Sequence, residues 1–284
     1  MQATLKVLCL LAYEPPARAR VQRVCAPDGV NGEWVGGPAL PGQRVLYFLH
    51  GSGYVGCSPA THRGLVSQLV ARTGRPAFVV RYRRGPEHSF PAATDDAVRG
   101  FEWLTDQGFD PSQIVVAGDS AGGHLAVGLC GELRRLGCVL PRALVLFSPL
   151  IDPTYSMAAD YARVSNDPLV SLRDARRITG MYTAGSNLED ARFDVIRDVG
   201  PDLPPMLIQA GGREMLRADA EKYAAALRAA GGICELEIWP GQMHVFQIAY
   251  RILPEARHAL DHAQRFIDEL PEPRQNASTD GVTA

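Results

Sequence analysis

The segment from Gly118 to Gly123 reads G-D-S-A-G-G and lies between two apolar stretches of different character. Residues 114–117 have the composition of a buried strand, and residues 125–133 have helical periodicity. A serine in a sharp turn from strand to helix needs small neighbours, because the bent backbone leaves little room for side chains. The segment therefore predicts a nucleophile elbow with Ser120 at its tip.

The residues around this serine fit the same prediction. Gly118 and Gly122 give the turn its room, while Asp119 and Ala121 flank the serine directly. The first N–H groups of the following helix, and its positive dipole end, would face a developing oxyanion. An ordinary Gly/Ser turn can have the same pentapeptide, so the rest of the chain has to decide between the two interpretations.

A serine nucleophile needs a base, and in the fold that uses this elbow an acid and then a histidine follow in the chain. Among the histidines after the elbow, His244 lies in a loop directly after a strand-like run, residues 234–239, and is the predicted base. His258 and His262 lie four residues apart on a helix-like stretch. Because no third ligand accompanies them, they are interpreted as a solvated helix face, and no metal site is predicted.

The acid should follow the preceding strand-like run, residues 206–210. Glu214 lies in the loop after that run and is the predicted acid. Asp219 lies further on, inside a helix-like segment, and is the alternative. Helix boundaries predicted from sequence are uncertain by about 2 to 4 residues, so both carboxylates stay in consideration.

An oxyanion hole is the remaining requirement of acyl transfer. The apolar run at residues 45–49 is followed by His50 and Gly51 and then by Ser52, Gly53 and Tyr54. Small residues there would let backbone N–H groups approach a carbonyl oxygen, together with the N–H of the residue after the nucleophile. A plain glycine-rich turn is the competing interpretation, but the position of this loop ahead of the elbow favours an oxyanion hole.

Strand-like and helix-like segments alternate along the chain, which predicts an α/β fold with a mostly parallel sheet covered on both faces. The expected strands are residues 45–49, 77–82, 114–117, 143–148, 206–210 and 234–239, with two edge strands at 21–24 and 33–35. The expected helices are residues 62–73, 92–107, 124–136, 217–230 and 254–269. Residues 1–274 are interpreted as one domain with a small helical cap from about 1–20 and about 152–200, and residues 275–284 as a disordered tail.

These motifs resemble the hormone-sensitive-lipase-like esterases of the α/β-hydrolases. H-G-S-G-Y is similar to the H-G-G-G loop of that family, and G-D-S-A-G-G to its elbow. The most specific match is R-Y-R-R-G-P-E-H-S-F-P-A-A-T-D-D-A at residues 81–97, and the resemblance runs from about residue 32 to residue 267. It implies an α/β-hydrolase fold and a serine carboxylesterase that needs no cofactor. The residues that it implies are a triad of Ser120, Glu214 and His244 and an oxyanion hole from the N–H groups of Ser52, Gly53 and Ala121.

The chain departs from the family pattern at several positions. Glu214 stands where the family usually has aspartate, and Ser52 replaces the middle glycine of the loop. A serine there needs either a negative φ or about 1 kcal/mol of local strain. Arg81 and Arg84 change the charge next to the expected pocket wall.

Composition agrees with a soluble enzyme of one domain. The 284 residues carry a net charge of −2, with no basic run that would bind nucleic acid. The apolar stretch at residues 7–12 is too short to span a bilayer, and a Pro-Pro pair follows it instead of a signal cleavage site, so membrane anchoring is not expected and a cytoplasmic location is. The six cysteines are interpreted as buried thiols. The sequence leaves the oligomeric state open, a homodimer included.

The expected reaction is hydrolysis of short or small carboxylic esters through an acyl-serine. Lactone hydrolysis and N- or O-deacetylation would use the same residues and are the alternatives. A binding protein that has lost catalysis is a further alternative from another class, but the related plant hormone receptors lack the catalytic histidine, and this chain has His244.

Overall fold

One sheet of eight strands runs through the computed structural model, which describes residues 20–271 apart from 160, 164–166 and 188. The strand order is β1-β2-β4-β3-β5-β6-β7-β8. The first two strands pair antiparallel with their neighbours, and all later pairings are parallel. The strands are β1 (Val21–Cys25), β2 (Asn31–Val35), β3 (Val45–Leu49), β4 (Ala77–Val80), β5 (Ile114–Asp119), β6 (Ala143–Phe147), β7 (Met206–Gly211) and β8 (Cys234–Trp239).

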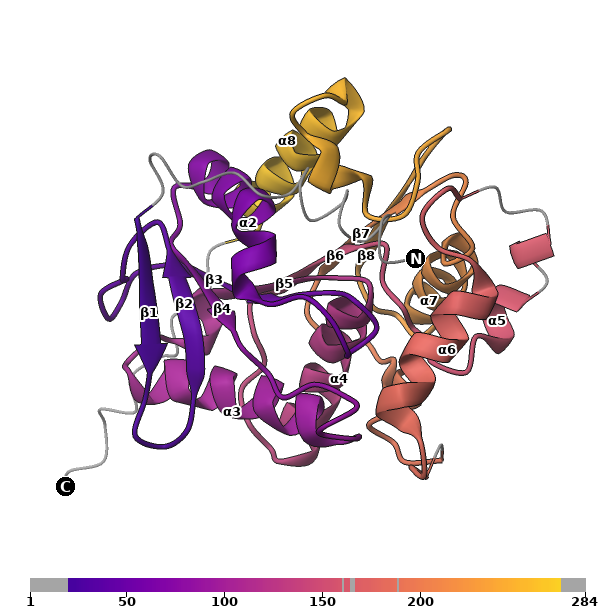
Figure 1. The fold of residues 1–284 in the computed structure, drawn as a ribbon. Coiled ribbons are helices and arrows are strands. Elements are labelled where there is room, and N and C mark those ends of the chain that lie inside the picture. Colours follow the sequence, from indigo (N-terminus) through magenta and orange to yellow (C-terminus); the bar gives the residue numbers. More distant parts are fainter. Residues whose placement is uncertain (1–19, 160, 164–166, 188, 272–284) are drawn as a thin grey trace.

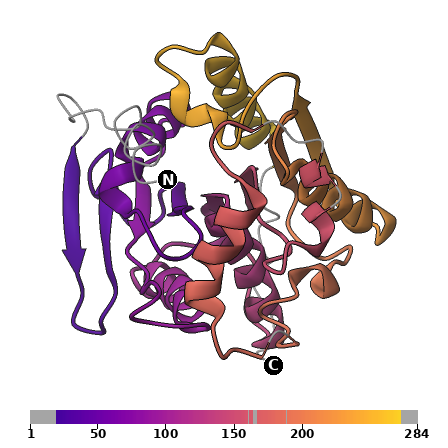
Figure 2. The same ribbon diagram turned by 45° about the vertical axis from the view of Figure 1, so that its right-hand side comes forward.

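Helices cover both faces of this sheet (Figures 1 and 2). On one face, α2 (Pro59–Thr73) and α8 (Pro254–Glu269) pack together over side chains such as Phe48 and Val79. On the other face lie α3 (Ala92–Asp106), α4 (Ala121–Arg135) and α7 (Arg217–Ala229). The central strands β3 to β7 are buried along their whole length, as expected for parallel strands covered on both faces.

The segment between β6 and β7 lies at the carboxyl ends of the parallel strands, and α6 crosses the front of the molecule there (Figure 2). It contains α5 (Ser156–Ala159) and α6 (Leu172–Thr183) and two short 3₁₀ helices, η2 (Tyr161–Arg163) and η3 (Val195–Asp198). Elsewhere in the described residues, the 3₁₀ helices are η1 (Pro111–Gln113) and η4 (Phe246–Ala249). Ligands of open α/β sheets bind outside the carboxyl ends of the strands, so this segment covers the expected position of a site.

The predicted α/β-hydrolase architecture is confirmed, edge strands included, with corrections at the ends of elements. The helix after the elbow begins at Ala121, earlier than the sequence suggested, because the chain enters helical geometry directly after Ser120. Helix α2 also begins early, with Pro59 in its first turn, where proline lacks only an N–H that would have no helical partner. The first predicted cap segment, apart from Arg20, and the predicted tail lie outside the described residues.

The expectation of buried thiols is wrong for most of the described cysteines. Cys25 ends an edge strand and Cys138 follows α4, and both are exposed. Cys57 and Cys234 are half-buried, and Cys130 is buried within α4. All five are free thiols.

Candidate active site

Ser120 occupies the turn between β5 and α4 in a conformation that few side chains adopt, with φ 52° and ψ −120°. The residues two positions before and after it, Gly118 and Gly122, must be glycine for a steric reason. A Cβ on Gly122 would lie 2.0 Å from the carbonyl oxygen of Leu49, and one on Gly118 would lie 2.5 Å from that of Gly122. The elbow is therefore packed against the end of β3, and the serine is the residue that the turn presents.

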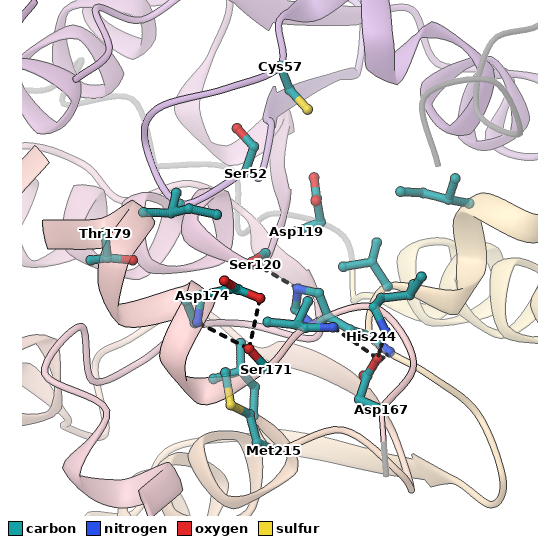
Figure 3. Close-up of a pocket in the computed structure, with 18 of the residues that line it drawn as sticks. Ser52, Cys57, Asp119, Ser120, Asp167, Ser171, Asp174, Thr179, Met215 and His244 are labelled. Carbon is teal, nitrogen blue, oxygen red and sulfur yellow. Dashed lines mark hydrogen bonds between the residues drawn. The ribbon is translucent and has the colours of Figure 1, made fainter. Parts of the chain in front are cut away.

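The three predicted residues of the triad lie in one hydrogen-bonded chain. Ser120 Oγ lies 3.0 Å from His244 Nε2, which gives the hydroxyl an acceptor (Figure 3). His244 Nδ1 lies 2.5 Å from Glu214 Oε2. Glu214 is 1% exposed, and its other oxygen accepts the N–H of Gly211 at 2.8 Å. The glutamate is thus held from both sides, and its extra methylene does not prevent contact with the histidine.

The protonation of His244 depends on this carboxylate. Burial alone would lower the pKa of His244, but the charge of Glu214 and its hydrogen bond outweigh burial and raise the pKa above the usual 6.5. Asp167 adds to this rise. The histidine is therefore a stronger base than a free imidazole while it remains inside the protein.

Asp167 is a residue of the site that sequence reasoning missed. Its Oδ2 accepts the backbone N–H of His244 at 2.7 Å, and its Oδ1 accepts the N–H of Leu169 at 2.7 Å. The Asp-Pro pair at this position indicates a turn. No local signal, however, could connect that turn with a loop much later in the chain.

The alternative acid, Asp219, does not lie against His244. It is fully buried in the first turn of α7, and its Oδ2 accepts the N–H groups of Ile151 and Asp152 at 2.8 and 2.9 Å. Burial raises its pKa to about 7. Asp219 therefore holds the loop after β6, and Glu214 is the carboxylate that contacts the histidine.

The predicted oxyanion loop passes close to the elbow with two consecutive residues at positive φ, Ser52 at 106° and Gly53 at 63°. The N–H groups of Ser52, Gly53 and Ala121 donate to no acceptor within the described part of the chain. The N–H of Gly51 is different, because it donates to Asp119 Oδ1 at 2.9 Å. Three donors beside the serine are thus available to an oxyanion.

His50 supports the loop from behind. Its Nδ1–H donates to the carbonyl of Gly51 at 3.1 Å, and burial, with repulsion from His62, lowers its pKa to about 3. The Tyr82 hydroxyl donates to the carbonyl of His50 at 2.6 Å. This contact gives the Y-R part of the matched segment a physical role, because Tyr82 fixes the start of the oxyanion loop.

The two arginines that depart from the family pattern lie away from the serine. Arg81 is exposed, and Arg84 donates to the carbonyl of Cys57. Neither side chain lines the cavity described below.

Replacing Ser52 with glycine is expected to stabilise the protein. A non-glycine residue at this φ stores local strain of about 1 kcal/mol, which glycine does not. Glycine is also freer in the unfolded chain, which costs roughly 0.5–1 kcal/mol, so denaturant unfolding of Ser52→Gly should show a free energy of unfolding higher by at most about 0.5 kcal/mol. A clear loss of stability would show that the serine side chain makes a stabilising contact.

A cavity of about 310 Å³ opens in front of the serine. Its walls are largely apolar. They come from the loop after β3 and the start of α2, from the segment between β6 and β7, and from the loops after β7 and β8. Ile178 of α6 packs against the oxyanion loop, since a Cβ on Gly53 would lie 2.7 Å from it. The buried hydroxyls of Tyr155 and Thr179 bond to each other at 2.7 Å. The cavity thus suits a small, mostly apolar group.

The predicted helix face with two histidines is only partly correct. His258 is exposed, but His262 is half-buried and bonds to Glu237. Among the described residues, no three His, Cys, Asp or Glu side chains form a group that could hold a metal ion. The described helices include none with the length and apolarity to cross a membrane.

The chain is similar to known proteins both in sequence and in fold. A family model described as an alpha/beta hydrolase fold matches residues 46–248. The chain is 37% identical to carboxylesterase/phospholipase LipF of Mycobacterium tuberculosis over 94% of its own length and 69% of that protein. It is 39% identical to an acetyl-hydrolase of Streptomyces hygroscopicus over 83% and 78% of the two chains. Among solved structures, an esterase from the bacterial hormone-sensitive lipase family superposes with a TM-score of 0.82 at 31% identity, covering 95% of this chain and 97% of that one.

Proposed function

The chain belongs to the α/β-hydrolase family, among the esterases related to hormone-sensitive lipase, and from this we propose that it hydrolyses small carboxylic esters through an acyl-enzyme on Ser120. Relatives named carboxylesterase and acetyl-hydrolase support ester hydrolysis in general. The observation that carries the finer proposal is the chain of contacts from Glu214 through His244 to Ser120, which ends at a cavity beside three free N–H groups.

The first half of the reaction uses His244 as a base. Nε2 takes the proton of Ser120 while Oγ attacks the ester carbonyl carbon, and the carbonyl oxygen becomes an oxyanion. The N–H groups of Ser52, Gly53 and Ala121 donate to that oxygen. When the intermediate collapses, the bond to the alcohol oxygen breaks, and His244 returns its proton to the departing alcohol. Glu214 accepts the hydrogen bond of Nδ1–H and fixes the tautomer of the ring, so that Nε2 is the nitrogen that accepts protons.

The second half releases the acyl group. His244 deprotonates a water molecule, whose oxygen attacks the acyl carbon of the Ser120 ester. The same N–H groups hold the second oxyanion. Collapse breaks the bond between the carbonyl carbon and Oγ, and the proton on His244 returns to Ser120.

Cavity size and the acetyl-hydrolase relative together favour short acyl groups. A volume of about 310 Å³ lies at the lower end of the range for ligand pockets, roughly 300–1,000 Å³. Lactones and acetylated amines of similar size would fit the same cavity and remain alternative substrates.

A chain-length series of p-nitrophenyl esters tests this proposal, with a lactone and an acetanilide beside it. We expect kcat/KM for acetate or butyrate to exceed that for octanoate by roughly 10-fold or more, because a longer chain has to displace packed side chains. Octanoate turning over as fast as butyrate would contradict a short acyl site. Faster turnover of the anilide than of the acetate ester would favour the deacetylase alternative.

A further inference from the structure

Three carboxylates line the cavity in front of Ser120, and no lysine or arginine accompanies them among the described residues of its wall. They are Asp119, Asp167 and Asp174. The other titratable side chains of the lining are Cys57, His62 and His244. The wall between these groups is largely apolar, and apolar walls focus the field of charges that share one sign. The cavity therefore presents a negative field to the part of a substrate that enters it.

Two of the three carboxylates are used to hold the protein together. Asp119 accepts the N–H of Gly51 at 2.9 Å and lies 3.3 Å from Nε2 of His62 on α2. Asp167 accepts the N–H of His244 at 2.7 Å. These contacts fix the start of the oxyanion loop and the loop of the catalytic histidine. The third carboxylate has no such task in the core of the site.

Asp174 lies in the first turn of α6, where its partner is Ser171 (Figure 3). Ser171 Oγ donates to Asp174 Oδ2 at 3.0 Å and accepts the N–H of Asp174 at 3.1 Å. The other carboxylate oxygen, Oδ1, has no hydrogen-bond or ion-pair partner in the described part of the chain. A carboxylate can accept about four hydrogen bonds, so Asp174 keeps acceptor capacity for a ligand in the cavity.

The basic residues of α6 do not neutralise this carboxylate. They are exposed and form no ion pair within the described residues: Arg173, Arg176 and Arg177. Asp174 and Ile178 are four residues apart, on the face of α6 that lines the cavity. Ile178 also packs on Gly53 of the oxyanion loop. The carboxylate therefore lies about one helical turn, roughly 5 Å along the axis, from the point where α6 contacts that loop.

We propose that Asp174 makes the cavity selective for esters that carry a cationic group, and that anionic esters are disfavoured. An ammonium group beside Asp174 is attracted by this carboxylate and by the two other aspartates, whereas a carboxylate there is repelled by all three. Because the proposed acyl group is short, the charge is expected on the alcohol part of the ester. The inference rests on the proposed function and names the substrate class of the same site.

Asp174 has a structural role as well, which the experiment has to separate from selectivity. A carboxylate in the first turn stabilises a helix through its dipole, and the hydrogen bond with Ser171 adds to this effect. A loss of stability in a variant is therefore no evidence for selectivity. The ratio of kcat/KM between two esters of equal shape and different charge is a suitable readout, because a helix cap does not change it.

Three acetate esters of similar shape provide this readout, with hydrolysis followed in a pH-stat. They are acetylcholine, its uncharged isostere 3,3-dimethylbutyl acetate, and the anion 4-acetoxy-2,2-dimethylbutanoate. In the parent protein, kcat/KM should be roughly 10-fold higher for the cation than for the neutral ester and roughly 10-fold lower for the anion, the order expected for partly screened charges about 7 Å apart. The difference should lie mainly in KM, because a charge remote from the reacting bond affects ground state and transition state alike. High salt should reduce it.

Asp174→Asn keeps the shape of the side chain and an acceptor for Ser171 while it removes the charge. The ratio of kcat/KM for the cation to that for the neutral ester should fall roughly 5- to 10-fold, and this comparison between proteins cancels the intrinsic reactivity of the esters. Asp95→Asn is the matched control, because Asp95 is an acidic residue in the first turn of α3 that does not line the cavity. Its ratio should stay within about twofold of the parent value. If Asp174→Asn does not fold, Asp174→Ser replaces it.

Several results would overturn this inference. They are equal kcat/KM for the three esters in the parent, a ratio that Asp174→Asn leaves unchanged, an equal fall in Asp95→Asn, and a difference confined to kcat. If none of the three esters is hydrolysed, choline should still inhibit hydrolysis of p-nitrophenyl butyrate at lower concentration than 3,3-dimethylbutanol, and the reverse order would refute the inference. Hydrolysis that Ser120→Ala abolishes but that shows no charge preference refutes selectivity alone. Hydrolysis that survives Ser120→Ala refutes the proposed function instead.

Discussion

Replacing Ser120 with alanine is expected to remove essentially all hydrolysis of p-nitrophenyl butyrate, with kcat reduced by roughly 10⁶-fold. The change deletes the attacking oxygen and leaves the oxyanion donors in place, so only the slow attack of water remains. His244→Ala should cause a similar loss, because the hydroxyl then has no acceptor for its proton, and the losses should not add in the double variant.

The matched control for this prediction is Ser112→Ala. Ser112 lies in η1 at the amino end of the same strand, far from the cavity, and its replacement should leave kcat within about twofold. Thermal unfolding of the variants has to show that the fold persists. Turnover by Ser120→Ala near the parent level would refute the assignment of the nucleophile.

Glu214→Gln is expected to lower kcat by roughly 10³- to 10⁴-fold while Asp219→Asn stays within about threefold. An amide in place of the carboxylate allows the wrong tautomer of His244 and no longer stabilises the imidazolium. The side-chain oxygen of Asn at position 219 can still accept the N–H groups of Ile151 and Asp152, so the loop after β6 keeps these hydrogen bonds. A larger loss in Asp219→Asn than in Glu214→Gln would exchange the two roles.

The pH dependence of kcat/KM in Glu214→Gln provides a second test of the role of Glu214. Only neutral His244 can accept the proton of Ser120, so kcat/KM falls as the pH drops through the pKa of this histidine. In the parent protein Glu214 raises that pKa above 6.5, which puts the acid limb above this pH. Glu214→Gln removes the charge while burial remains, so the acid limb should move to lower pH. An unchanged acid limb would mean that another group controls it.

Much of the site could be predicted because its residues follow strands. Ser120 directly follows β5 and His244 lies in the loop after β8, and parallel strands bring their carboxyl ends to one edge of the sheet. The choice between Glu214 and Asp219 needed the structure, because it depends on where α7 begins. That helix starts at Arg217, which turns Asp219 toward the loop after β6.

Other features depend on contacts that no local pattern encodes. The sequence allows either sign of φ at Ser52. In the structure φ is positive, and the two neighbouring glycines, Gly51 and Gly53, pack against Asp119 and Ile178. Asp167 contacts the His244 loop across a long stretch of chain, from a segment without clear periodicity. The pairing of His62 with Asp119 likewise joins α2 to β5, and the spacing of the two residues gives no hint of it.

Covalent labelling of the nucleophile tests the central claim most directly. After reaction with a p-nitrophenyl alkylphosphonate, intact mass spectrometry should show a single adduct, and the peptide that carries it should contain Ser120. Ser120→Ala should remain unlabelled, and His244→Ala should react far more slowly, because its serine is not activated. An adduct on a different residue, or equal labelling of Ser120→Ala, would contradict the proposal that this serine carries the acyl group.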